Sequence, residues 1–160
     1  MATLDVGPGR NVQPHTVQPV IRLDHRLIVK PNVVGDVRAL PFRDNCFEVV
    51  YASHVLEHFH YRETDAILRE WLRVLRPGGA FEIFVPNLEW CLLQLVNSIE
   101  DYENIQHSLF GRQEYPSDVH RTGFSPAILA RRLEPLPLEN VEIRTFRNNI
   151  CVWSRKRNDA

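Results

Sequence analysis

The chain has 160 residues, of which 44% are hydrophobic and 24% are charged, and its formal net charge is −1. This composition suits one globular domain and excludes an intrinsically disordered chain, which would combine low hydrophobicity with a large net charge. The near-neutral charge also argues against nucleic acid as a partner, because dedicated nucleic-acid-binding domains are usually basic.

The cysteines and the start of the chain bear on the cellular compartment. The three cysteines lie far apart and include no Cys-x-x-Cys pair, which is a poor basis for a disulfide framework or a zinc site. The first residues lack the pattern of a secretory signal, and no apolar run approaches the roughly 18 residues of a membrane span. We therefore expect a soluble, cytoplasmic protein with no membrane span.

In chain order, runs of apolar and β-branched residues predict seven short strands. Their expected ranges are Thr3–Val6, Val20–Asp24, Asn32–Asp36, Phe47–Ala52, Ala80–Val85, Val141–Phe146 and Ile150–Ser154. An amphipathic helix is predicted from Glu63 to Leu75, and Pro77-Gly78-Gly79 is expected to end it. We expect the side chains of Trp71 and Trp153 in the core.

The second half of the chain continues this alternation. A helix is expected over about Leu88–Tyr102, a polar loop over Gly111–Gly123, and a third helix from Ser125-Pro126. Only Arg147-Asn148-Asn149 separates the last two strands, a spacing that permits a hairpin. The prediction is an α/β fold, a doubly wound, mostly parallel sheet with an antiparallel last strand, in one domain over residues 1–160.

The front half leaves little room for helices. About thirteen residues separate the first two predicted strands, with Pro14 and Pro19 among them, and about seven separate the second and third. A crossover between parallel strands usually needs a dozen or more residues and a helix. We therefore expect reduced front-half helices and thin cover over that part of the sheet.

Ligands of an open α/β sheet bind beyond the carboxyl ends of its strands, so the residues there form the candidate site. The first strand runs into Gly7-Pro8-Gly9, where two glycines allow close approach of the backbone to a ligand, although an ordinary turn is the alternative. Asp24 ends the second strand, where a carboxylate can hold both hydroxyls of a ribose or can be a solvated surface group. Asp36 follows the third strand and Ser53-His54 the fourth, which completes a set suited to a nucleoside.

Three stretches of the chain carry a family resemblance. They read GDVRALPFRDNCFEVVYASHVLEHF, LREWLRVLRPGGAFEIFVPN and FGRQEYPSDVHRTGF. In order and spacing they resemble class I S-adenosylmethionine-dependent methyltransferases, and most of all a small group of predicted methyltransferase domains. The resemblance implies a Rossmann-like methyltransferase sheet, a methyltransferase activity and S-adenosyl-L-methionine (SAM) as the cofactor.

The resemblance also assigns cofactor contacts to residues of this chain. The residues implied for the methionine part of SAM are Asp5, Gly7, Pro8 and Gly9. Asp24 is implied for the ribose, His25 for a place beside the adenine, and Asp36 and Val37 for the adenine edge. Ser53 and His54 are implied to lie beneath the sulfonium. Pro8 stands where the group usually has a small residue or cysteine.

Two histidines are candidates for proton transfer. If the methyl acceptor is a hydroxyl or an amine, a base can take its proton, and imidazole suits that task near neutral pH. The candidates are His58, after the fourth strand, and His120, in the later loop; a capping or loop-bonding role is the alternative for each. Glu114, Tyr115 and Arg121 of that loop are predicted to contact the acceptor.

The histidines also allow a metal-based interpretation. His54-Val55-Leu56-Glu57-His58 matches H-x-x-E-H, the inverted zinc-peptidase motif. A zinc site would need a third ligand, and the methyltransferase resemblance accounts for the same residues, so no metal site is predicted. His60 adds another imidazole nearby, which leaves adventitious metal binding open.

The predicted function is SAM-dependent methyl transfer to an oxygen or nitrogen nucleophile of a small-molecule or glycan-type acceptor. The alternative is a scaffold or partner subunit that binds SAM or S-adenosylhomocysteine (SAH) without methylating. The missing front-half helices keep this alternative open. They also suggest a homodimer, in which a second copy covers the bare sheet face.

Overall fold

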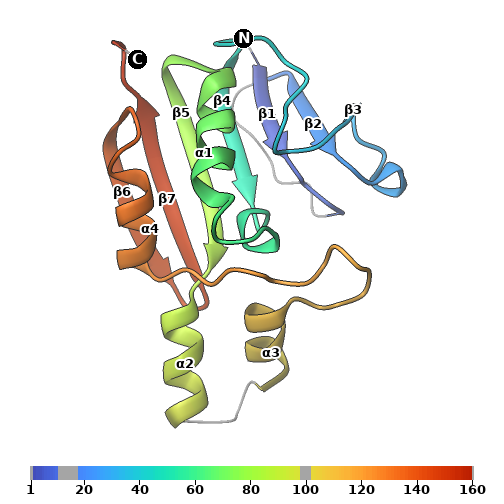
Figure 1. Ribbon diagram of the computed structural model, residues 1–160, viewed down its shortest axis with the longest axis vertical. Coiled ribbons are helices and arrows are strands. Elements are labelled where there is room, and N and C mark those ends of the chain that lie inside the picture. The colour runs from blue at the N-terminus through green and yellow to red at the C-terminus, as the bar shows by residue number, and fades with distance from the viewer. Residues whose placement is uncertain (1, 11–17, 98–101, 160) are drawn as a thin grey trace.

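The computed structural model describes residues 2–10, 18–97 and 102–159. Within these ranges, seven strands form one sheet in the order β3-β2-β1-β4-β5-β7-β6 (Figure 1). Their bounds are β1 Ala2–Val6, β2 Val20–Asp24, β3 Val33–Val34, β4 Phe47–Ser53, β5 Leu75–Pro86, β6 Leu138–Phe146 and β7 Asn149–Lys156. Strands β1 to β5 pair in parallel, whereas β7 runs antiparallel to both β5 and β6. The predicted α/β sheet with an antiparallel last strand is confirmed.

The helices follow the predicted order with one difference. Their bounds are α1 Thr64–Val74, α2 Leu88–Asn97, α3 Tyr102–Phe110 and α4 Pro126–Leu133, with short 3-10 turns η1 Leu27–Val29 and η2 Leu56–His58. Ser125 caps α4 as expected, because its side chain accepts a hydrogen bond from the Ile128 N–H. The one helix expected over Leu88–Tyr102 is α2 followed by α3, and residues 98–101 lie outside the described part of the chain. No helix in the described ranges is long and apolar enough to cross a membrane.

The strand ends differ from the prediction in the middle of the chain. β5 begins at Leu75, directly after α1, because the Pro77-Gly78-Gly79 stretch continues the strand instead of separating it from the helix. A register shift between Phe47 and Val49 of β4 accommodates the additional residues of β5. β3 is shorter than predicted, because the Asp36 carboxylate accepts a hydrogen bond from the Arg38 N–H and turns the chain.

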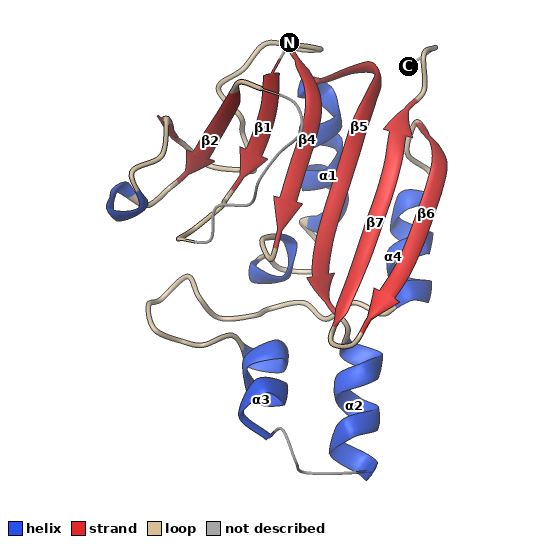
Figure 2. Ribbon diagram, turned by 180° about the vertical axis from the view of Figure 1, so that it is seen from behind, coloured by secondary structure: helices blue, strands red, loops and turns tan. Residues whose placement is uncertain are grey.

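The helices are distributed unevenly over the two faces of the sheet. α1 and α4 cover one face (Figure 1), whereas no helix of the described residues lies over the opposite face (Figure 2). Thin cover was predicted for the front half alone, and that prediction was too narrow, because the uncovered face extends across β4, β5 and β7. The connection from β2 to β3 would supply a helix to this face, and it holds only the short turn η1. Figures 1 and 2 also show α2 and α3 beyond the edge at which β4 and β5 end.

The core lies between the covered face of the sheet and the helices α1 and α4. One cluster of buried apolar side chains extends from Leu4 of β1 to Val152 of β7. Trp71 of α1 is fully buried in it, as predicted, and its indole Nε1 donates a hydrogen bond to the Val37 carbonyl at 2.9 Å. The indole therefore joins α1 to the segment that follows β3.

Arg73 of α1 holds the rest of that segment. Its guanidinium donates hydrogen bonds to the carbonyl oxygens of Leu40 and Phe42 and to the carboxylates of Asp44 and Glu70. The hydrogen bonds from Arg73 hold the pKa of Glu70 below its usual value. Because several charge-assisted hydrogen bonds meet at one planar group, the Leu-Pro-Phe turn has a fixed position against α1.

Candidate active site

The turn after β1 brings the backbone close to the edge of the sheet. Gly7 and Gly9 both have positive φ angles, +62° and +58°, which glycine adopts without steric cost. A Cβ atom on Gly7 would lie 2.9 Å from Cγ2 of Val55, so this position leaves no room for a side chain. Gly7, Pro8 and Gly9 therefore form a tight turn at the carboxyl end of β1, where ligands of open α/β sheets bind.

Asp24 faces this turn from the end of β2. Its side chain is 3% exposed, so the alternative of a solvated surface carboxylate is wrong. The Gly9 N–H donates to Oδ2 at 3.2 Å and the Arg26 N–H donates to Oδ1 at 2.9 Å. The carboxylate thus ties the glycine turn to β2, and its two oxygens retain further lone pairs for ligand hydroxyls.

The other predicted cofactor residues near β1 and β3 have mixed positions. Asp5 is buried in β1, and Val37 has its side chain in the core and its carbonyl bound to Trp71. Asp36 is half-exposed after β3, and hydrogen bonds from Arg38 hold its pKa below the usual value. The Asp36 oxygens therefore already accept hydrogen bonds from the Arg38 guanidinium. An adenine amino group would donate to the same oxygens.

The end of β4 carries a buried acidic residue beside a histidine. His54 has a positive φ of +55°, and its Nδ1 lies 3.1 Å from Oε1 of Glu57, whose side chain is 1% exposed. Burial lowers the pKa of His54, but the hydrogen bond and charge of Glu57 outweigh it and raise that pKa overall. Burial likewise raises the pKa of Glu57, and His54 more than reverses this, so the carboxylate is ionised. Ser53 precedes this pair as the last residue of β4.

The loop 111–123 brings a second histidine to Glu57. The Arg121 and Thr122 N–H groups donate to the Glu57 carbonyl at 2.7 and 3.1 Å, which fixes the loop on η2. His120 Nε2 then lies 3.8 Å from Glu57 Oε1, and the His58 and His120 rings meet edge to face with centroids 4.9 Å apart. Burial lowers the pKa of His120 and favours its neutral form. The structure thus brings together the two histidines that the sequence selected.

The same loop reaches the cofactor side of the sheet. The Tyr115 ring lies 4.3 Å from the Arg26 guanidinium, and Ser117 Oγ lies 3.1 Å from His25 Nε2. Tyr115, which was predicted to contact the acceptor, is therefore beside Arg26, two residues after Asp24. Glu114 and Arg121, the other two residues predicted to contact the acceptor, are exposed.

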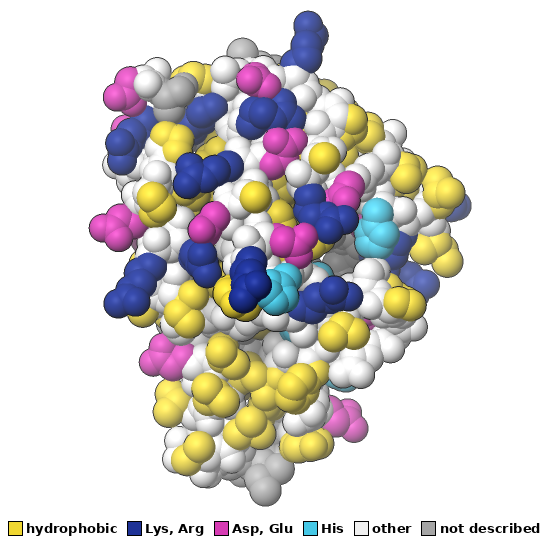
Figure 3. All heavy atoms as spheres, viewed as in Figure 1, with side chains coloured by type: hydrophobic (Ala, Val, Ile, Leu, Met, Phe, Trp, Pro, Cys, Tyr) yellow, Lys and Arg dark blue, Asp and Glu magenta, His cyan; other side chains and the backbone are white. Residues whose placement is uncertain are grey.

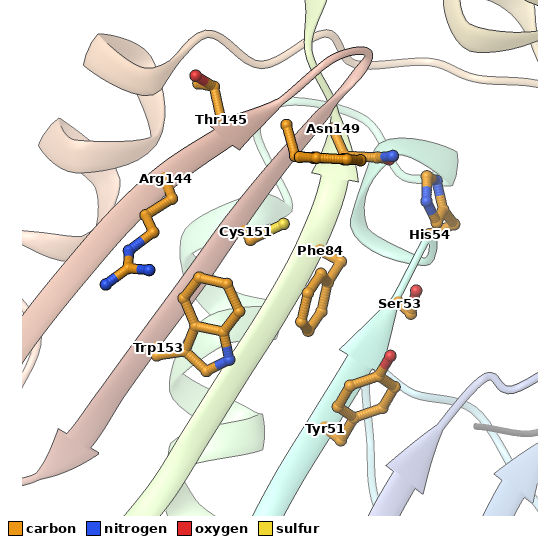
Figure 4. Close-up of a pocket in the computed structure, with 10 residues that line it drawn as sticks. Tyr51, Ser53, His54, Phe84, Arg144, Thr145, Asn149, Cys151 and Trp153 are labelled. Atoms are coloured by element: carbon orange, nitrogen blue, oxygen red, sulfur yellow. The ribbon is translucent and has the colours of Figure 1, made fainter. Parts of the chain in front are cut away.

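An open groove of about 510 Å³ lies on the uncovered face. Its lining residues, most of which are labelled in Figure 4, are Tyr51, Ser53, His54, Phe84, Arg144, Thr145, Phe146, Asn149, Cys151 and Trp153. Phe84 is in ring contact with both Tyr51 and Trp153, at centroid distances of 5.3 and 5.6 Å. The prediction of Trp153 as a core residue was wrong: it lines the groove, and no helix among the described residues covers its face of the sheet. The every-second-residue spacing of Tyr51 and Ser53 along β4 was the signal that could have identified this face.

A second apolar surface lies on the two helices beyond the sheet. Figure 3 shows hydrophobic side chains gathered over the part of the molecule formed by α2 and α3, whereas charged side chains predominate over α1. The most exposed of them are Leu92, Leu93, Val96, Tyr102 and Phe110. This apolar surface borders the 111–123 loop, since α3 ends at Phe110.

These features together test the fit of a nucleoside cofactor. The side-chain-free turn at Gly7 and Gly9 and the buried Asp24 carboxylate lie next to each other at the edge where β1 and β2 end. Such an arrangement fits SAM, because the glycine turn admits its methionine part and the carboxylate can accept hydrogen bonds from its ribose. The fold and the site define a class I, Rossmann-like methyltransferase domain.

Comparison with known proteins agrees with this class. Residues 4–83 match a family model described as a methyltransferase domain. The ubiquinone/menaquinone biosynthesis C-methyltransferase UbiE of Cupriavidus necator is 28% identical over 127 residues, which are 76% of this chain and 51% of that protein. The demethylmenaquinone methyltransferase of Corynebacterium efficiens is 45% identical over 53 residues, 33% of this chain and 22% of that protein.

Solved structures share the fold. A SAM-dependent methyltransferase from Archaeoglobus fulgidus superposes with a TM-score of 0.72 and 16% identity, covering 97% of this chain and 86% of that one. The chain belongs to the methyltransferase domain family and has the fold of its class I, SAM-dependent members. It spans about half or less of the length of the curated relatives just described.

Proposed function

We propose that the chain transfers a methyl group from SAM to an oxygen or nitrogen atom of a small-molecule or glycan-type acceptor. The observation that carries the proposal is the meeting of Glu57, His58 and His120 at the carboxyl end of β4. This is the same edge of the sheet at which Asp24 and the glycine turn lie. Imidazoles at that position support proton removal from a hydroxyl or amine acceptor.

The cofactor residues have distinct tasks in this proposal. SAM supplies an electrophilic methyl group on a positively charged sulfur. Asp24 would accept hydrogen bonds from the ribose hydroxyls, and His25, Asp36 and Val37 would hold the adenine. Asp5 and the Gly7-Pro8-Gly9 turn would hold the methionine part, and Ser53 and His54 would hold the part that carries the sulfur. Catalysis then depends mainly on holding the acceptor atom in line with the methyl group and excluding water.

The acceptor is expected to approach from the groove and the 111–123 loop. Burial lowers the pKa of His120 and favours its neutral form, and the His58 ring lies beside it, so the pair can take a proton from the acceptor. Glu114, Tyr115 and Arg121 offer polar contacts along the loop. We expect Arg121 to suit an acceptor that carries negative charge.

A carbon acceptor is the competing candidate within the same reaction class. The relatives described above are named as quinone-pathway methyltransferases, one of them a C-methyltransferase. The aromatic side chains of Tyr51, Phe84 and Trp153 in the groove favour a flat apolar ligand, which would suit such an acceptor. A scaffold that binds SAM or SAH without methylating remains the alternative of a different class, and the uncovered sheet face favours it.

Calorimetric titration with SAM and SAH tests the proposal. Wild type should bind both, and Asp24→Ala should bind at least about tenfold more weakly, because it removes charge-assisted hydrogen bonds to the ribose. Asp159→Ala, near the exposed end of the chain, is the control for loss of one carboxylate and should bind as wild type does. Thermal unfolding of Asp24→Ala separates lost binding from lost folding, since Asp24 also holds the glycine turn.

The outcomes discriminate between the candidates. Absence of SAM and SAH binding by wild type would contradict both the enzyme and the scaffold. Binding without SAH formation across a panel of sugars, phenols and amines favours the scaffold, and methylation of a quinone precursor alone favours a carbon acceptor.

We further propose a homodimer in which a second copy covers the uncovered sheet face and closes the groove. Light scattering at tens of micromolar should then give twice the chain mass of 18.7 kDa. Trp153→Asp should shift the population to monomer, whereas Phe110→Asp on α3 should not. A monomeric wild type would refute the dimer. A cytoplasmic location stays a prediction, supported by the free thiols of all three cysteines.

A further inference from the structure

The residues around Glu57, which the proposed function uses for proton removal, also have the geometry of a metal-ion site. One ligating atom each from Glu57, His58 and His120 lies within 4.8 Å of the others. His58 and Glu57 are adjacent in η2, while His120 comes from a loop more than sixty residues later in the chain. Two imidazoles and one carboxylate form the donor set of many mononuclear zinc and non-haem iron sites.

The histidines are oriented as metal ligands are. His58 Nδ1 lies 3.3 Å from the Val119 carbonyl oxygen, and His120 Nδ1 lies 3.0 Å from the Ser108 carbonyl oxygen. A carbonyl oxygen accepts hydrogen bonds and donates none, so each neutral ring keeps its proton on Nδ1. The lone pair is then on Nε2 in both rings. Backbone carbonyls commonly fix metal-binding histidines in this way.

The carboxylate supplies an independent observation. Glu57 is 1% exposed, and its Oε2 has no hydrogen-bond partner among the residues that the structure describes. Its other oxygen, Oε1, faces His54 Nδ1 at 3.1 Å. A buried carboxylate oxygen without a hydrogen-bond partner is costly unless something binds it. A divalent cation would satisfy it, and His54 would hold the carboxylate in place.

We propose that Glu57, His58 and His120 bind one divalent transition-metal ion of the zinc class, with His54 as a positioning residue. Three protein ligands leave at least one coordination position for water or another oxygen ligand, and His58 is accessible enough to admit it. The sequence predicted no metal site because the motif of His54 and His58 needed a third ligand and the methyltransferase resemblance accounted for its residues; His60 left only adventitious binding open. In the structure His60 packs against Tyr61, and the third ligand is His120.

The site also narrows the proposed function, and this step rests on it. A divalent ion at the end of β4 would lie beside the predicted methyl position and would lower the pKa of a bound acceptor hydroxyl. The two imidazoles would then serve as ligands, and the acceptor would be an oxygen nucleophile rather than an amine or a carbon.

Metal binding to the full chain tests the site directly. Metal-free protein titrated with Co²⁺ should bind one equivalent with the visible absorption of a low-coordinate site, and Zn²⁺ should displace it. His58→Asn and His120→Asn should each weaken Co²⁺ binding more than tenfold, and Glu57→Gln should do so as well. His107→Asn, on the exposed surface of α3, is the matched control and should bind as wild type does. If the Glu57→Gln variant fails to fold, the test depends on His58→Asn, whose side chain is only partly buried. Circular dichroism shows whether the His58→Asn variant is folded.

Two results would overturn the metal site: no stoichiometric Co²⁺ binding by wild type, or equal binding by His120→Asn. SAH binding to the same protein is measured separately by calorimetry, in the presence of a chelator that removes free metal. SAH binding with no metal binding leaves the proposed function intact and refutes the metal site. Metal binding with no SAH binding supports the metal site and refutes the proposed function.

Discussion

Trp71→Ala is expected to lower the free energy of unfolding by about 3–5 kcal/mol, the usual cost of truncating a fully buried aromatic side chain. Trp71 is 0% exposed, and no side chain next to it can fill the space of an indole without moving α1 away from the sheet. The substitution also leaves the Val37 carbonyl without its indole donor. Chemical denaturation followed by circular dichroism measures the loss as a lower midpoint at unchanged slope.

The same substitution at the second tryptophan is the control. Under conditions that keep the chain monomeric, Trp153→Ala removes an equal side chain from the uncovered face, leaves no closed cavity, and should cost less than about 1.5 kcal/mol. Trp71→Phe should fall between the two, since it keeps most of the buried ring but loses the hydrogen bond. Under conditions that allow association, equal losses for Trp71→Ala and Trp153→Ala would show that the sheet face at Trp153 is buried in solution, as the homodimer requires.

The regular elements were predictable because their signals are local. Ile67, Leu68 and Trp71 repeat at helical spacing and mark the buried face of α1 in the sequence itself. The short Arg147-Asn148-Asn149 connection likewise dictates an antiparallel β7. Strand ends such as Asp24 could be selected as site residues because the carboxyl edge of a parallel sheet is a general rule of the fold.

The remainder of the site depends on contacts between distant parts of the chain. Nothing near Glu57 in the sequence indicates that Arg121 and Thr122 will bind its carbonyl, so the partnership of His58 with His120 emerges only in the folded chain. The groove was missed for a different reason. Its apolar residues, such as Phe84, have the pattern of core strands. The short connections predicted thin cover over the front half alone, whereas the face without a helix among the described residues extends to β7.

Gly111→Ala is expected to open the 111–123 loop, with at least about a 100-fold faster amide hydrogen exchange at Arg121 and Thr122. Gly111 has a φ of +78°, and a Cβ atom there would lie 1.8 Å from the Asp118 carbonyl oxygen. A Cβ atom and a backbone oxygen cannot share that space, so the loop must leave its position at the end of α3. His120 would leave Glu57 with it, and SAH formation by the active enzyme should fall on the order of 100-fold.

Gly123→Ala separates this effect from a general intolerance of the loop to alanine. A Cβ atom at Gly123 would meet the end of the Leu88 side chain at 2.7 Å, and a flexible side chain can move aside at small cost. Gly123→Ala should therefore keep the wild-type exchange at Arg121 and Thr122. Wild-type exchange in Gly111→Ala would contradict the closed loop itself, because the alanine fits only if Asp118 is already elsewhere. The position of His120, and with it both the proton-transfer and the metal proposals, thus depends on one glycine at the start of the loop.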